Sequence, residues 1–343
     1  MQIEKKNTIE VNAKPRLYCV DMAKGILIIL VAMHHMTMRG DELGISCPAM
    51  SFFMPLVSTF LFYMPAFFVI AGFFARYDAS FKDFVIKNAR VLLLPLIIFS
   101  LLGGMLKEIF YEILKGSYNA DALEAPSYFI SIDYWFVLAL FLAKCIYWGV
   151  CRISEKYWVR LLVCIGFYVL GVAALEIWLP NYFCWNHALI LLVYLPIGQW
   201  IFNHLDGWKA FLVSLVVLIA GCCFYRWQGL NIPAPEGGML LNLKSALPSL
   251  FLCVAGSFVF LKLCSLVKRA RLLEIVGRNT LAIYIMHWWV EILAMKVLRG
   301  FFSQGVWMST LATLVVLAAA VLVPCLISEL LNLPKLRWVL GKS

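Results

Sequence analysis

The sequence predicts an all-α, polytopic membrane protein, a bundle of about ten transmembrane helices. Hydrophobic residues make up 63% of the 343 residues and charged residues only 14%, which leaves too few polar side chains to cover a water-soluble globule. Apolar runs of about 20 residues, the length that crosses a hydrocarbon core of about 30 Å, recur along the whole chain. Apolar and polar residues do not alternate within these runs, as they would in the strands of a membrane barrel.

The apolar runs set the expected order of the helices. Their spans are 17–38, 51–75, 89–106, 128–150, 159–178, 185–202, 209–225, 246–267, 279–298 and 306–331. The longest connections between them are too short to form a core of their own. We therefore expect one membrane domain over 17–331, between a cytoplasmic N-terminal segment, 1–16, and a cytoplasmic C-terminal tail, 332–343.

The distribution of basic residues gives the orientation of the helices. The chain carries 29 Lys and Arg against 19 Asp and Glu, a formal charge of +10. Most of these cations fall in alternate connections, beginning with the N-terminal segment, and the positive-inside rule places such connections in the cytoplasm. Both termini are therefore predicted to be cytoplasmic, and the positive charge indicates membrane topology rather than nucleic-acid binding.

The 11 cysteines are scattered through the apolar spans. They show no paired metal-ligand spacing, so no metal site is expected, and we interpret the thiols as small buried hydrophobes.

The first span carries ionisable residues inside its apolar run: Asp21, Lys24, His34 and His35. Ionisable groups in hydrocarbon cost several kcal/mol unless they are paired or hydrated, so they indicate a functional site. The spacing of Lys24 and His35 puts both on one helix face, about 16 Å apart along the axis. A structural ion pair between Asp21 and Lys24 is the simpler alternative. His34, about 100° round the helix, is the alternative base.

Further motifs follow along the chain. Lys87 and Arg90 stand three residues apart within Phe-Val-Ile-Lys-Asn-Ala-Arg at 84–90, and Pro95 follows. Tyr-Trp-Phe-Val opens a later span at 134–137. Near the other end, 277–287 reads Gly-Arg-Asn-Thr-Leu-Ala-Ile-Tyr-Ile-Met-His.

These motifs, with Arg16, Asp21, Lys24 and His35, resemble the integral-membrane acyltransferase family three, the O-acyltransferases of bacterial surface sugars. Lys24 and Lys87 stand where many relatives carry Arg. Lysine keeps the positive charge but lacks the planar guanidinium that donates two parallel hydrogen bonds. The short chain and Ala-Gly-Phe-Phe at 71–74 favour the fucose 4-O-acetylase-like branch.

The resemblance implies an acyltransferase with acetyl-CoA, or another short acyl-CoA, as the donor substrate and a hydroxyl of a glycan or glycolipid as the acceptor. It implies a multi-pass protein of the bacterial cytoplasmic (inner) membrane that O-acetylates a polysaccharide or its precursor. The expected partners are acyl-CoA, the acceptor and membrane lipids, with no nucleic acid and no metal. A homodimer is as compatible with the sequence as a monomer.

The same resemblance assigns roles to individual residues. His35 is expected to be the general base, because an imidazole with an ordinary pKa of about 6.5 accepts a hydroxyl proton near neutral pH. Asp21 is the second catalytic candidate. Cations suit the phosphates of coenzyme A, and the expected donor-binding residues are Lys24, Lys87, Arg90, Arg278, Tyr284 and His287.

Simpler explanations remain for several of these residues. Lys87 and Arg90 would also satisfy the positive-inside rule alone. A pair between His287 and Glu291, four residues apart, would satisfy two buried polar groups and is a structural explanation for both. A covalent acyl-histidine is an alternative to direct transfer.

Two other functions are consistent with the composition. A transporter or flippase for a surface-polysaccharide intermediate would also need polar residues in its spans. A structural subunit of a polysaccharide-synthesis complex would not, so the intramembrane charges count against it.

Overall fold

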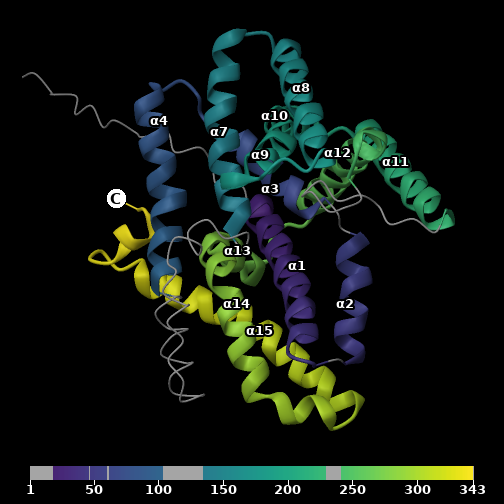
Figure 1. Ribbon diagram of the computed structural model, residues 1–343, viewed down its shortest axis with the longest axis vertical. Helices are drawn as coiled ribbons and strands as arrows, with labels where there is room; N and C mark the ends of the chain where they lie inside the picture. The colour runs from purple at the N-terminus through teal and green to yellow at the C-terminus, as the bar shows by residue number, and fades with distance from the viewer. Residues whose placement is uncertain (1–17, 46, 60–61, 103–133, 229–240, 343) are drawn as a thin grey trace, which may run out of the picture.

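The computed structural model describes residues 18–45, 47–59, 62–102, 134–228 and 241–342, and every regular element in these ranges is helical (Figure 1). Within them, nine helices are long and apolar enough to cross a membrane. The prediction of an all-α polytopic bundle is confirmed. The predicted N-terminal segment, 1–16, and the predicted helical residues 103–106 and 128–133 lie outside the described ranges.

The helices follow the predicted order. They are α1 (Tyr18–Glu42), α2 (Pro48–Thr59), α3 (Tyr63–Phe74), α4 (Phe81–Asn88), the π-helical turn η1 (Ala89–Leu93), α7 (Trp135–Ile153), α8 (Tyr157–Glu176), η4 (Tyr182–Cys184), α9 (Trp185–Leu192), α10 (Tyr194–His204), α11 (Trp208–Trp227), α12 (Leu243–Leu266), α13 (Arg271–Arg278), α14 (Thr280–Val297), η5 (Arg299–Ser303), α15 (Val306–Leu331) and η6 (Arg337–Leu340).

The predicted second span, 51–75, is wrong as a single helix. The structure has two helices of 12 residues there, α2 and α3. Pro65 lies in the first turn of α3, where a proline needs no backbone N–H, whereas further inside a helix its ring would clash with the preceding turn. A helix of this length rises about 18 Å, so neither crosses the hydrocarbon core alone.

The predicted third span, 89–106, begins too late. The helix starts at Phe81, because the Ser80 hydroxyl accepts a hydrogen bond from the N–H of Asp83 at 3.2 Å and caps it. Lys87 and Arg90 therefore lie inside the helix rather than at its start. The turn before Pro95 is π-helical, and such a wide turn accommodates the missing proline N–H.

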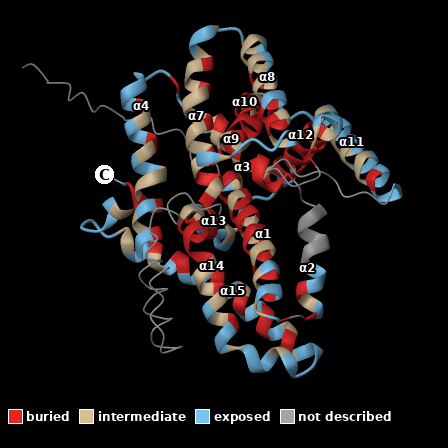
Figure 2. Ribbon diagram, in the orientation of Figure 1, coloured by how far each residue is buried: buried red, intermediate tan, exposed pale blue. Residues whose placement is uncertain are grey.

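Burial separates the centre of the bundle from its periphery (Figure 2). α1, α9, α10 and α12 are largely buried. α11 is the opposite case, with exposed apolar side chains such as Leu212, Val213 and Val216 along it. An exposed apolar helix is the expected partner of lipid chains.

Two helix crossings bring backbones into contact. A Cβ atom on Gly198 of α10 would lie 2.1 Å from the carbonyl oxygen of Val69 in α3. A Cβ atom on Gly277 of α13 would lie 1.7 Å from the carbonyl oxygen of Asp21 in α1, and Gly25 faces α13 at the same crossing. Small residues allow this close approach, which is how helices commonly pack in membranes.

Connections that the sequence assigns to the cytoplasm meet in the structure. The Arg152 guanidinium donates hydrogen bonds to the carbonyl oxygens of Tyr77 and Ala79, at 2.6 and 3.1 Å. Arg269, which precedes α13, lies over the ring of Tyr18 at the start of α1, 4.9 Å from its centroid. These contacts support the predicted alternation of inner and outer connections, while the cytoplasmic side itself stays a prediction.

Replacing Gly198 by alanine should destabilise the bundle, because α3 and α10 must separate to admit the methyl group. Overpacking of this kind costs about 1–3 kcal/mol, which lowers the apparent unfolding temperature in detergent or nanodiscs. Gly166→Ala in α8 is the matched control, since a Cβ there meets nothing within 4 Å. Equal unfolding temperatures for the two variants would contradict this account of the crossing.

Candidate active site

α1 packs beside α13 and α14 and runs in the same direction (Figure 1). The two segments touch at Gly25 and Gly277. Ten residues after each of these glycines, the two segments carry His35 and His287, whose ring centroids lie 5.1 Å apart. Ten residues of helix rise about 15 Å, so the two segments keep one register from the glycine contact to the histidine pair.

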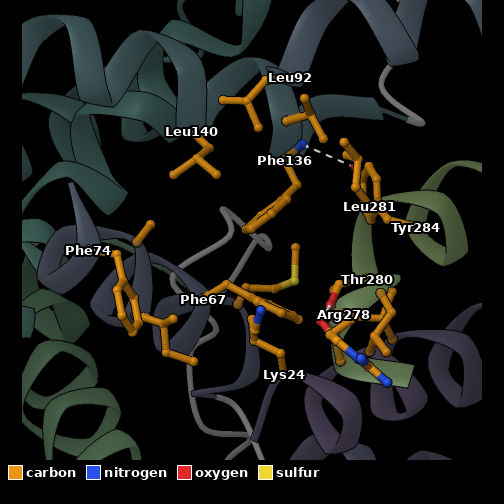
Figure 3. Close-up of a pocket in the computed structure, with 17 residues that line it drawn as sticks. Lys24, Phe67, Phe74, Leu92, Phe136, Leu140, Arg278, Thr280, Leu281 and Tyr284 are labelled. Carbon is orange, nitrogen blue, oxygen red and sulfur yellow. Dashed lines mark hydrogen bonds between the residues drawn. The ribbon is translucent and has the colours of Figure 1, made fainter. Parts of the chain in front are cut away.

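A cavity of about 290 Å³ lies beside this seam, walled by α1, α3, η1, α7, α13 and α14. Its lining is mostly apolar, with Phe67 and Phe136 prominent (Figure 3). The Lys24 ammonium extends toward these two rings, whereas the Arg278 guanidinium points away from the centre of the cavity (Figure 3). The cavity therefore has a cationic rim and an apolar interior.

The α1 wall of the cavity is a single stripe of side chains. Lys24, Ile28 and Val31 line it, and His35 follows Val31 by one turn on the same face. His35 itself does not line the cavity but lies one turn beyond it. The predicted alignment of Lys24 and His35 on one helix face thus holds in the structure, with the cavity along most of its length.

The alternative pairing of Asp21 with Lys24 is also present. The Lys24 Nζ atom lies 2.9 Å from Oδ1 of Asp21, and Asp21 is buried. The pair neutralises a buried carboxylate while Lys24 stays partly exposed to the cavity. Asp21 therefore positions Lys24 and lies well away from the histidine pair along α1.

His287 does not form the predicted pair with Glu291. Its Nδ1 atom lies 2.8 Å from the carbonyl oxygen of Ile283, and since a carbonyl only accepts, Nδ1 carries the hydrogen. Nε2 is then the accepting nitrogen of the neutral ring. It is buried and has no hydrogen-bond partner among the described residues, and the same is true of both carboxylate oxygens of Glu291.

His34 takes a different direction from His35. Its ring stands edge-on to the ring of His35 at 5.6 Å and lies 6.5 Å from that of Tyr63 in α3. His35, and not His34, therefore lies on the same face of α1 as the residues that line the cavity.

Residues 17–329 match the model of a family described as an acyltransferase domain. The chain belongs to acyltransferase family 3. The match supports a multi-pass membrane acyltransferase and does not distinguish the branches of the family. No curated protein and no solved structure gives a significant match to the chain.

In this family 3 acyltransferase, the cationic motif on α4 and η1 lies apart from the cavity lining. Lys87 and Arg90 are exposed, and neither lines the cavity. Arg278, which does line it, is exposed as well. Of these three cations, only Arg278 therefore borders the cavity.

Lys144 is a further cation of the acyltransferase that the sequence reasoning missed. Its Nζ atom donates a 2.7 Å hydrogen bond to Oδ1 of Asn88, and no carboxylate pairs with it in the described part of the chain. Asn88 directly follows Lys87, and Lys144 stands one turn from Leu140 of the cavity wall. A lone lysine inside the apolar run of α7 was the available signal.

Tyr284 has a structural role that the sequence did not predict. Its hydroxyl accepts a 3.3 Å hydrogen bond from the N–H of Phe136 (Figure 3). Phe136 lies in the first turn of α7, where backbone N–H groups lack a partner within the helix. Tyr284 thus ties α14 to the start of α7 while its side chain lines the cavity.

Tyr284→Phe should therefore reduce stability while keeping the aromatic wall. Loss of the acceptor for the Phe136 N–H is expected to lower the free energy of unfolding by about 1 kcal/mol, measured by thermal or denaturant unfolding in nanodiscs. Tyr182→Phe is the control, because Tyr182 is 70% exposed. If both variants unfold like the wild type, the hydrogen bond does not stabilise the start of α7.

Proposed function

We propose that the protein transfers an acetyl or other short acyl group from cytoplasmic acyl-CoA to a hydroxyl of a glycan or glycolipid at the bacterial cytoplasmic membrane. One observation carries this proposal: the stripe that leads from the Lys24 ammonium, along an apolar cavity, to the paired rings of His35 and His287. Membership of an acyltransferase family supports it.

The cationic rim suits the charged part of the donor. Lys24 and Arg278 border the cavity and supply the charge-assisted hydrogen bonds that diphosphates favour. Lys87 and Arg90 precede Leu92 of the cavity wall in sequence, and Lys144 follows Leu140 of the wall by one turn. Their positive charge would help to attract a polyanionic substrate from solution. The apolar interior fits the uncharged arm and thioester of acyl-CoA.

We assign the proton transfer to His35. It accepts the proton of the acceptor hydroxyl while that oxygen forms a bond to the thioester carbonyl carbon. The carbon–sulfur bond then breaks, the sulfur leaves with the electron pair, and the imidazolium returns the proton to it. The products are the O-acyl ester and free coenzyme A, so the reaction balances without another reactant.

His35→Ala should abolish most of the transfer. A general base contributes about 10²–10⁴-fold to the rate, and a loss of that size is expected for membranes or nanodiscs supplied with radiolabelled acetyl-CoA and an envelope glycolipid fraction. His34→Ala is the matched control and should retain at least a third of the wild-type rate. Equal transfer by wild type and His35→Ala would remove His35 from the mechanism.

Acetyl-CoA should stabilise the folded protein. A transporter for a polysaccharide intermediate would not bind acetyl-CoA and so would not be stabilised by it. A ligand at about 100 times its Kd contributes about 2.7 kcal/mol to the stability of the folded form, visible as a rise in unfolding temperature.

Lys24→Met should raise the Kd for acetyl-CoA about tenfold or more, the effect of one lost charge-assisted hydrogen bond. Lys296→Met, at an exposed position near the far end of α14, should leave it unchanged. An equal Kd for the two variants would argue against the donor site.

A further inference from the structure

After α15 the chain folds back in a short structured segment, residues 333–342, which contains η6. Gly341 ends η6 with a φ of 69°. Its N–H donates a 2.9 Å hydrogen bond to the carbonyl oxygen of Trp338, and the N–H of Lys342 donates one of 3.1 Å to that of Arg337. This pair of bonds is the Schellman motif that commonly ends a helix at a glycine. The C-terminal segment 333–342 therefore has a defined conformation of its own.

The C-terminal segment packs on η1, the turn that continues α4 (Figure 1). A Cβ atom on Gly341 would lie 2.1 Å from the carbonyl oxygen of Arg90 and 2.9 Å from the Cα atom of Val91. Leu340 is buried as well. The next residue of η1, Leu92, lines the cavity. Backbone contact at Gly341 therefore fixes the segment next to the cavity wall.

The other side of the segment carries unpaired positive charge. Lys335, Arg337 and Lys342 are exposed, and none of them forms an ion pair with a carboxylate in the described ranges. The segment contains no acidic residue. Glu329, the nearest carboxylate in the sequence, accepts a 3.1 Å hydrogen bond from the Asn279 amide. We call Lys335, Arg337 and Lys342 the basic face.

Exposed apolar side chains accompany the basic face at the end of a membrane helix. α15 has the highest mean hydropathy of the nine candidate spans in the described ranges, and the segment begins two residues after its end. Trp338 is 53% exposed and Leu336 is 41% exposed. Tryptophan, lysine and arginine are typical of the level at which a helix leaves the hydrocarbon, because each combines an apolar part with a polar end. The basic face is therefore expected among the lipid headgroups.

We propose that the basic face binds the phosphate headgroups of anionic phospholipids. Ammonium and guanidinium groups donate charge-assisted hydrogen bonds to phosphate oxygens, while Trp338 and Leu336 contact the upper part of the acyl chains. A soluble acidic partner would match the charge alone, whereas exposed tryptophan and leucine beside a membrane span favour a lipid. The proposal goes beyond the proposed function, because it requires neither acyl-CoA nor the histidine pair.

The test compares two lipids that differ only in the headgroup. Purified full-length protein in detergent receives equal amounts of phosphatidylglycerol and phosphatidylcholine with the same acyl chains, and native mass spectrometry measures the Kd for each. Each Lys or Arg near an anionic surface strengthens binding about fivefold, so we expect the wild type to prefer phosphatidylglycerol by about tenfold or more. Combining Lys335→Gln, Arg337→Gln and Lys342→Gln should remove most of this preference.

The matched control combines Lys82→Gln, Lys156→Gln and Lys209→Gln, which removes the same charge from exposed positions on other connections. It should keep the wild-type preference. Glutamine at position 342 keeps a donor for the Asn332 side chain, to which Lys342 donates a hydrogen bond. Both triple variants should therefore unfold at the wild-type temperature in lipid-free detergent, which separates a loss of binding from a loss of folding.

Three results would overturn the lipid site: equal affinity of the wild type for the two lipids, a wild-type preference in the variant of the basic face, and an equal loss of preference in the control variant. The last result would mean that phosphatidylglycerol responds to total charge and not to this face. Binding of acetyl-CoA is measured on the same samples. If the variant of the basic face keeps the lipid preference but binds acetyl-CoA more weakly than the wild type, the face belongs to the donor site instead.

Discussion

The contact between the backbones of α1 and α13 is the constraint on which the site depends. At Gly25 and Gly277 a Cβ atom would overlap the opposite backbone, so the two helices have little freedom to slide or rotate. Because both helices run in parallel from there, every later pair along the seam follows from this one contact. The contact between His35 and His287 therefore depends on how the two helices pack and does not follow from the sequence of either helix alone.

The seam orders its polar groups by depth. The Asp21–Lys24 pair lies near the start of α1 and the apolar cavity follows. The histidine pair comes next, followed by Arg39 on α1 and Glu291 on α14. Ionisable groups are costly in a membrane interior unless they are paired or serve a function. Several such groups lie along this seam, whereas Lys144 lies outside it on α7 and α11 exposes apolar side chains.

Local patterns predicted much of this architecture. Helical spans depend on runs of apolar residues, and the shared face of Lys24 and His35 depends only on helical periodicity, so both were predictable. The break between α2 and α3 depends on Pro65, which the apolar run around it concealed. The start of α4 depends on the Ser80 cap. The contact between His35 and His287 joins two helices that are far apart in the sequence, so local periodicity could not predict it. The spacing along α14 instead suggested a pair between His287 and Glu291.

Charge is distributed unevenly along the seam. Lys24 and Arg278 border the cavity, so this end of the seam is suited to a ligand that carries phosphates. At the other end of the seam, Arg39 is already paired with Glu42, so this end offers no net positive charge. An acyl-CoA bound at the cationic end would direct its thioester along the apolar cavity towards the histidine pair. Reversed binding would bury its phosphates beside a guanidinium that is already paired, where nothing offsets their loss of hydration. The charge distribution along the seam thus favours one orientation for the proposed donor.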